Sequence, residues 1–221
     1  MKIKTFASSA VLLTLVFLAS CGKSDGGNGG GKLRSLNNLE AKQIDEGSYR
    51  ALLRPFNNHL NGFLPSGIAE IEVRGDQITV KTLLDDDGRV MHMQSVHMGN
   101  RCPITARDDQ NGDTYVDIKE MEAITGPVLF PLDGNLNSHE EGAGQYPMGR
   151  GFTYIKTASL SKLAGDVKSR SGQNLNLEGR VIVIHGVDPR TKLPDTFATR
   201  DGLTPQAAAP IVCGIIKREA P

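Results

Sequence analysis

The sequence predicts an all-β domain, a Greek-key sandwich or barrel with one or two short helices. Three observations support this: short apolar runs, clusters of Gly, Pro, Asn and Asp between them, and little helical periodicity. Many short strands separated by turn residues are typical of antiparallel sandwiches and barrels. The chain has 221 residues, and after its N-terminal segment we expect one β-sandwich domain, at 33–221.

The clearest strands form a predicted hairpin. Ile68, Ile71, Val73, Ile78 and Val80 sit among charged and polar residues, and the four residues 74–77 between the two runs are Arg-Gly-Asp-Gln. Further strands are expected at the apolar runs 90–96, 128–132, 152–155, 181–184 and 211–216.

Helical spacing is weak. Leu160, Leu163 and Val167 predict one short helix, and a second is expected around Ile118 and Ile124. The acidic residues 85–87 precede Gly88, and we interpret them as a hairpin turn.

The N-terminus has the layout of an export signal. Lys2 and Lys4 precede an apolar run at 10–18, which is followed by small residues and Cys21. The run is about half of the ~20 residues that span a membrane, so a permanent anchor or a buried helix is the weaker interpretation. Residues 18–21, Leu-Ala-Ser-Cys, resemble a lipobox, which implies a signal peptide at 1–20 and lipidation of Cys21.

Residues 21–32 continue from this cysteine as a Gly-rich linker. We therefore expect a cell-envelope protein held to a membrane by its lipid. Gly22 stands where many inner-membrane lipoproteins carry an acidic residue, and that resemblance favours the outer membrane.

The amino-acid composition argues against several classes of binding partner. The 25 basic and 25 acidic residues balance, and no basic cluster favours nucleic acid. Aromatic residues make up 5% of the chain and tryptophan is absent, so a stacking platform for sugars or bases is not expected. No Gly-x-Ser-x-Gly turn or phosphate-binding glycine loop occurs. The sequence does not identify a protein or small-ligand partner.

Two cysteines remain once Cys21 is lipidated. In a compartment that permits disulfides, Cys102 and Cys213 are predicted to pair, and two separate buried thiols are the alternative.

Residues 109–120 carry the strongest chemical motif. Side-chain oxygens occur at positions one, three, five, nine and twelve, and a backbone carbonyl is available at position seven. Calcium needs six to eight oxygen ligands, which alternating residues of a curled loop can supply. The expected ligands are Asp109, Asn111, Asp113, Tyr115 through its carbonyl, Asp117 and Glu120.

This loop resembles that of the EF-hand, with one departure. Thr114 stands at position six, where the family has glycine, and Gly112 stands at position four. Because only six residues, including Pro103, separate Cys102 from the loop, we expect no entering helix and a single inserted loop similar to those of dockerin-like modules. Val116 is expected to anchor the loop to the core. A solvated acidic loop held by Asx turns is the alternative.

Three segments look like copper/zinc superoxide dismutases, in family order. They are 92–97 followed by Cys102, the Gly-Arg strand 179–185 that ends in His185, and the Cys-Gly strand 211–216. The resemblance implies a sandwich, the Cys102–Cys213 bond, and copper ligation by His97 and His185. The stretches 96–99 and 126–128 also resemble chordin-type (CHRD) domains, which would make 49–56 the opening strand.

By this resemblance, the residues that a copper/zinc dismutase uses to bind its metals and guide its substrate are only partly present. Ser95 stands where another copper ligand is expected, no histidine-rich zinc segment follows Cys102, and Pro210 replaces the family's anion-guiding arginine. His97 and His185 are thus interpreted first as structural residues. A weak copper site helped by His92 or by Met91, Met93 and Met98 is the alternative. We expect a non-enzymatic calcium-binding lipoprotein, and a divergent copper-dependent dismutase or copper-binding envelope protein is the alternative.

Overall fold

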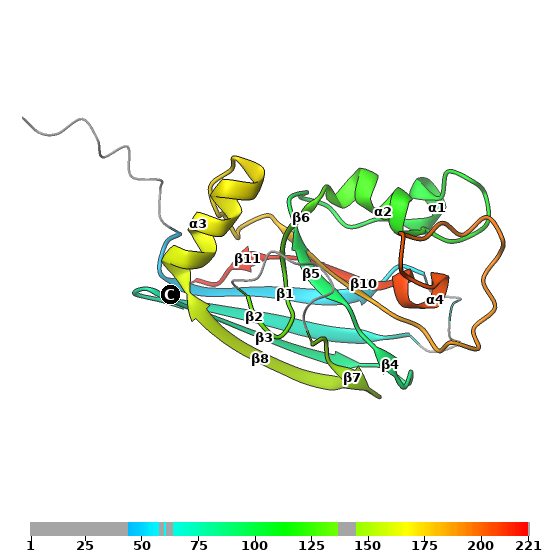
Figure 1. Ribbon diagram of the computed structural model, residues 1–221, viewed down its shortest axis with the longest axis horizontal. Coiled ribbons are helices and arrows are strands. Elements are labelled where there is room, and N and C mark those ends of the chain that lie inside the picture. Colours follow the sequence, from blue (N-terminus) through cyan, green and yellow to red (C-terminus); the bar gives the residue numbers. More distant parts are fainter. Residues whose placement is uncertain (1–43, 58–59, 61–63, 137–144, 221) are drawn as a thin grey trace, which may run out of the picture. The chain divides into compact units, whose positions relative to one another are not determined.

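A computed structural model describes residues 44–57, 60, 64–136 and 145–220, all within one compact unit (Figure 1). The predicted signal peptide, Cys21 and the Gly-rich linker lie outside the described residues. None of the described helices has the length and apolar character needed to cross a membrane.

The described strands form one large sheet, in the order β6-β5-β9-β10-β1-β2-β3-β8, with β11 added beside β1, and a small sheet of β4 and β7. Every pairing is antiparallel. The strands are β1 (Gly47–Pro55), β2 (Ser66–Arg74), β3 (Gln77–Asp85), β4 (Val90–Met91), β5 (Gln94–His97), β6 (Val128–Pro131), β7 (Met148–Gly149), β8 (Phe152–Ser159), β9 (Val181–His185), β10 (Pro210–Ile215) and β11 (Lys217–Arg218).

The predicted all-β sandwich or barrel class is confirmed. The sheet has two halves, β6-β5-β9-β10 and β1-β2-β3-β8. The chain crosses from β3 to β5 and from β6 to β8, between distant places in the sheet order, so the two halves curl over one core. That core is built from alternating inward residues of both halves, such as Ile71 and Val80 from one half and Ile182 and Val212 from the other.

Four helices are described: α1 (Thr105–Asp108), α2 (Ile118–Thr125), α3 (Leu160–Ser171) and α4 (Pro205–Ala208). The two predicted helices correspond to α2 and α3. Ser159 caps α3, whose Leu160, Leu163 and Val167 are buried, and Gly172 ends it in a left-handed conformation. Since α3 contacts both β8 and β6, it packs between the two edges of the curled sheet.

Two predictions of local structure were wrong. The acidic segment after β3 is not a hairpin turn, because β3 ends at Asp85 and Val90 pairs instead with Gly149. The interval before residue 109 does admit a helix, since α1 fits one turn into Thr105–Asp108 after Pro103. Asp108 stabilises this turn by accepting hydrogen bonds from the Ile104 N–H at 2.8 Å and from Arg101, and the Arg101 hydrogen bond lowers its pKa.

A second, smaller core lies on the outer face of the β9–β10 half of the sheet. It joins Val181, Val183 and Cys213 of the sheet to Ile118 and Met121 of α2. Figure 1 shows α1, α2 and α4 gathered at one end of the sheet, where they form this covering layer.

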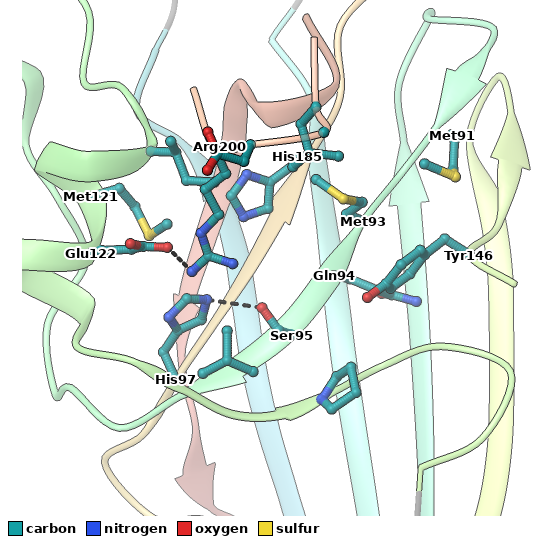
Figure 2. Close-up of a pocket in the computed structure, with 16 residues that line it drawn as sticks. Met91, Met93, Gln94, Ser95, His97, Met121, Glu122, Tyr146, His185 and Arg200 are labelled. Atoms are coloured by element: carbon teal, nitrogen blue, oxygen red, sulfur yellow. Dashed lines mark hydrogen bonds and ion pairs between the residues drawn. The ribbon is translucent and has the colours of Figure 1, made fainter. Parts of the chain in front are cut away.

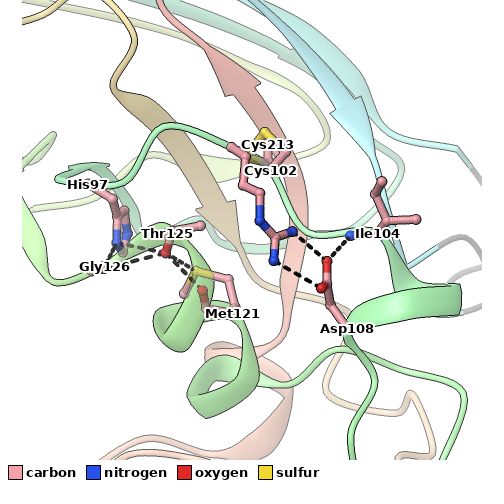
Figure 3. The surroundings of a disulfide bond; sticks show 9 residues. His97, Cys102, Ile104, Asp108, Met121, Thr125, Gly126 and Cys213 are labelled. Atoms are coloured by element: carbon pink, nitrogen blue, oxygen red, sulfur yellow. Dashed lines mark hydrogen bonds and ion pairs between the residues drawn. A yellow bond between two sulfur atoms is a disulfide. The ribbon is translucent and has the colours of Figure 1, made fainter.

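The disulfide fastens the covering layer to the sheet. Cys102 and Cys213 are bonded, with their Cα atoms 5.7 Å apart, which confirms the predicted pairing. Cys102 precedes α1 and Cys213 lies in β10, so the bond joins the cover to the strand beneath it (Figure 3).

Candidate functional site

The 109–120 loop is organised around its own carboxylates. Asp109 accepts hydrogen bonds from the N–H groups of Gly112 (2.8 Å), Asp113 (3.2 Å) and Thr114 (2.7 Å). Asn111 Oδ1 accepts from Asp113 N at 2.9 Å. Asp113 Oδ1 accepts from the N–H two residues later, in Tyr115, at 3.0 Å. These Asx turns curl the segment into a compact loop.

The loop closes through Glu120 and Asp117. Glu120 Oε1 accepts from Gln110 N at 2.7 Å, and Glu120 Oε2 accepts from Asp117 N at 3.0 Å. Asp117 in turn caps α2 by accepting from Lys119 N and Glu120 N, so the two residues form a capping box. The last two predicted ligands thus also start the helix.

Thr114 takes the backbone conformation of the family's glycine. Its φ is +74°, and among the described residues it alone combines a positive φ with a side chain other than hydrogen. Gly112 also has a positive φ, of +77°. The turn at position six is therefore kept, and Thr114 bears the steric cost of the left-handed conformation.

The loop is anchored to the sheet at position eight. Val116 is fully buried in the smaller core, as predicted. Asn57 lies two residues after the end of β1 and binds the backbone of Val116. Its side-chain amide accepts from the Val116 N–H and donates to the Val116 carbonyl, both at 2.9 Å. Its side-chain amide also donates to the Pro210 carbonyl.

The donor chemistry of the loop fits a hard cation. Every predicted ligand offers oxygen, from three aspartates, one asparagine, one glutamate and the Tyr115 carbonyl. As the side chains stand, no three His, Cys, Asp or Glu residues within the described ranges are grouped so as to hold a metal ion. The loop carboxylates accept from backbone N–H groups instead, and Asp109 Oδ1, Asp117 Oδ1 and Glu120 Oε1 each accept two such hydrogen bonds.

The same acidic residues bind a distant segment, residues 196–203, which consists of turns and irregular backbone. We name this segment the cover strand, although it belongs to neither sheet. Asp113 Oδ2 accepts from the Thr196 hydroxyl at 2.8 Å, and Asp117 Oδ2 accepts from Ala198 N at 3.0 Å. Farther along, Arg200 pairs with Glu122 of α2. The loop therefore supports both α2 and the cover strand.

His97 and His185 meet in one cavity of about 400 Å³. His97 ends β5 and His185 ends β9, and the two strands pair directly. The two histidines lie toward opposite ends of this antiparallel pair. The cavity lies between the pair and the covering layer, and Met121, Arg200 and Leu203 contribute to its walls. Figure 2 shows both imidazoles and Arg200 facing the same space.

Each imidazole is held through Nδ1. His97 Nδ1 lies 2.9 Å from the Gly126 carbonyl, and His185 Nδ1 lies 2.8 Å from the Ala208 carbonyl. Because a carbonyl only accepts, both Nδ1 atoms carry hydrogen and both Nε2 atoms offer lone pairs. Ser95 donates its hydroxyl to His97 Nε2 at 2.9 Å, and no described residue hydrogen-bonds to His185 Nε2.

Both histidines are neutral at pH 7. Burial lowers the pKa of each from 6.5 to about 4. Their hydrogen bonds to backbone carbonyls raise the pKa values, whereas the nearby charge of Arg200 lowers them further.

Among the described residues, the cavity brings together fewer nitrogen ligands than a redox copper centre needs. Such a centre needs three or four nitrogen ligands, and no third His, Cys, Asp or Glu among the described residues joins His97 and His185 to hold a metal. Ser95 hydrogen-bonds to His97 rather than adding a nitrogen. Met91 and Met93 do line the cavity, whereas Met98 packs against the main core.

His92 serves the structure. Its Nδ1 faces the His185 carbonyl at 3.1 Å, and its Nε2 lies 3.5 Å from Asp86 Oδ2. Both side chains are fully buried. Asp86, expected in a surface turn, thus forms an internal pair with His92, and burial raises its pKa.

Comparison with known proteins gives no family. No family model and no curated protein matches the chain. Sixty-one chains of solved structures match. One of them, described as the crystal structure of the clock protein EA4, has a TM-score of 0.41 and 13% identity, and the match covers 79% of this chain and 96% of that chain.

Sequence reasoning missed the residues that come from far along the chain. Arg200 places a guanidinium near the two histidines, and sequence reasoning did not single this residue out. Met121 lines the cavity from α2, which sequence reasoning did not indicate, and Asn57 was not considered. One local signal was present: Thr204 and Pro205 form a helix N-cap and first turn, which places α4 directly after the cover strand.

Proposed function

We propose that this chain is a non-enzymatic calcium-binding lipoprotein of the cell envelope, a binding or structural module on a superoxide dismutase-like or CHRD-like sandwich. The observation that carries the proposal is the 109–120 loop, whose oxygen donors curl around one another with a left-handed residue at position six. Asp109, Asn111, Asp113, Asp117, Glu120 and the Tyr115 carbonyl would hold the ion, which supplies charge neutralisation and rigidity.

Calcium titration by calorimetry tests this proposal, with magnesium as the competing ion. Asp113→Asn removes one charge while an amide oxygen can still accept from Tyr115 N, so it weakens calcium binding by about tenfold with little change in the fold. Glu70→Gln on the exposed face of β2 is the matched charge control and leaves affinity unchanged. Absence of both binding heat and a calcium-dependent rise in melting temperature would disprove the calcium site.

The membrane part of the proposal depends on Cys21. Mass spectrometry of the mature protein, produced in a Gram-negative host, should find a diacylglyceryl group on an N-terminal Cys21, and Cys21→Ser should abolish the modification and release the protein from membranes. An unmodified N-terminus elsewhere would contradict it. Sucrose-gradient fractionation tests the preference for the outer membrane over the inner.

A copper-dependent enzyme is the second candidate, because His97 and His185 converge on one cavity. Electron paramagnetic resonance after copper loading, together with a superoxide assay, separates the two candidates. A stoichiometric copper signal with activity well above that of free copper would favour the enzyme. We expect neither.

A further inference from the structure

We propose that the cavity between β5, β9, α2 and the cover strand is a binding site for a small, uncharged aromatic compound that donates one N–H or O–H hydrogen bond to His185 Nε2. The inference goes beyond the calcium loop and does not depend on it. The carrying observation is the His185 Nε2 acceptor, to which no residue of the described ranges hydrogen-bonds and which is accessible from an open, mainly apolar cavity.

The acceptor is fixed in place. His185 is 4% exposed, and its Nδ1–H is held by the Ala208 carbonyl at 2.8 Å. This hydrogen bond leaves the Nε2 lone pair available toward the cavity that the side chain lines. A ligand that fills the cavity and covers this lone pair without donating to it would leave the acceptor unpaired at a cost in free energy, so a ligand that donates to it is favoured.

The walls favour an aromatic ligand. Thioethers of Met91, Met93 and Met121 and the ring of Tyr146 line the cavity. Sulfur makes favourable contacts with aromatic rings, and unbranched methionine side chains adapt to flat shapes. A volume of about 400 Å³ lies within the range of small-molecule sites and exceeds that of a bicyclic ring.

The charges favour a neutral ligand. The positive charge of Arg200 acts on both histidines and disfavours cations in the cavity. The carboxylates of Glu122 and Asp201 line the same cavity and disfavour anions. Figure 2 shows Glu122 joined to Arg200 beside His97, so the guanidinium is already partnered by a carboxylate.

Indole is a suitable probe. The chain contains no tryptophan, so indole fluorescence can be followed directly during titration of the full chain. The matched probes are 1-methylindole, which lacks the donor, and indole-3-carboxylate, which adds a negative charge. We expect indole to bind at least tenfold more tightly than either, since a site with a buried acceptor discriminates against a ligand that leaves it unpaired.

Two substitutions of one residue isolate the acceptor. His185→Asn retains an amide that can donate to the Ala208 carbonyl but has no atom at the Nε2 position, so it should lose the preference for indole over 1-methylindole. His185→Gln places an amide near Nε2 and should keep part of that preference. The Nε2 ¹⁵N shift of wild-type His185 should move with indole and stay unchanged with 1-methylindole.

Several results would overturn the proposal: no indole binding, equal binding of indole and 1-methylindole, or a preference that survives in His185→Asn. If His185→Asn does not fold, an unmoved Nε2 signal in the wild type is sufficient to reject it. Calcium binding without indole binding would reject this inference alone, and the reverse result would reject the calcium site alone.

Discussion

Thr114 and Gly112 share a left-handed backbone, with φ values of +74° and +77°, but they differ in side chain. A β-branched residue in this conformation costs roughly 1–2 kcal/mol, whereas glycine adopts it freely. The free-energy cost at Thr114 comes from its backbone conformation. The residue is not a predicted ligand, so this cost can be removed without changing a ligand. Calcium affinity should therefore be limited by one position that can be changed without touching the donor oxygens.

Thr114→Gly should strengthen calcium binding and raise the free energy of unfolding by about 1 kcal/mol, partly offset by the greater freedom of glycine in the unfolded chain. Gly112→Ala is the matched opposite change. A Cβ at Gly112 meets nothing within 4 Å, so its penalty is one of backbone conformation alone. Calorimetry and urea unfolding of both variants measure the effects. Weaker binding in Thr114→Gly would show that the threonine is favoured in the loop.

His97 and His185 make stability depend on pH. Each has a pKa of about 4 in the folded protein, against 6.5 as its ordinary value. Between these values the unfolded chain binds more protons, so the free energy of unfolding falls as the pH decreases from 6.5 toward 4. Each histidine contributes a loss of about 3 kcal/mol, which is present in full below the folded pKa.

Urea unfolding of the wild type at pH 7 and at pH 4 measures this loss. His97→Gln and His185→Gln each remove one titrating ring, so the difference between the two pH values should shrink by about 3 kcal/mol in each variant. Carboxylates that also titrate are common to all three proteins and cancel in the comparison. A pH dependence that is the same in the variants and the wild type would show that neither histidine is buried in its neutral form.

At the scale of elements, the 109–120 loop and the cavity walls are one connected structure. Asp117 caps α2 with Oδ1 and binds Ala198 N with Oδ2, and Asp113 binds Thr196. The helix and the cover strand both contribute residues to the walls of the cavity. An ion that fixes these two carboxylates would therefore also fix both walls.

Removal of calcium with a chelator should increase amide hydrogen exchange in residues 196–203 and in the first turn of α2. The α3 helix serves as the internal control, because it packs between β6 and β8. Exchange that changes equally in α3, or in neither region, would show that the loop does not support the cover.

Elements were predictable where burial imposes a period on the sequence. The β2–β3 hairpin alternates buried and exposed residues, and β9 and β10 are continuous apolar runs buried on both faces. The strands β4, β7 and β11 contain two residues each and carry no periodic signal. Local sequence also gave no reason for Pro103 to be followed by a helical turn.

The site divides in the same way. The loop ligands lie in one segment, so spacing identified them, and the family pattern pointed to His97 and His185. Arg200 could not be placed, because its position beside His97 depends on how the cover strand folds back onto α2. Asp86 was misassigned for a similar reason: its acidic neighbours suggest a surface turn, yet the β4–β7 pair buries it against His92.

At the scale of the whole molecule, the covering layer is joined to the sheet by a covalent bond, a small core and hydrogen bonds. Val116 and Met121 pack on Val183, and the Cys102–Cys213 bond fixes the start of the cover to β10. The covering layer contains the 109–120 loop and forms one side of the histidine cavity. Its attachment to the sheet therefore determines whether either feature persists in partly unfolded states.

Cys102→Ala/Cys213→Ala should lower the free energy of unfolding by up to ~5 kcal/mol, the chain-entropy value for a bond that closes a loop of 111 residues. The loss should appear in equilibrium urea unfolding without a reducing agent. In hydrogen exchange the double variant should open first at residues 102–120, while β1–β3 remain protected, because those strands are paired with one another along their length. Equal protection of both regions, together with an unchanged free energy of unfolding, would show that the noncovalent contacts of the smaller core hold the cover without the disulfide.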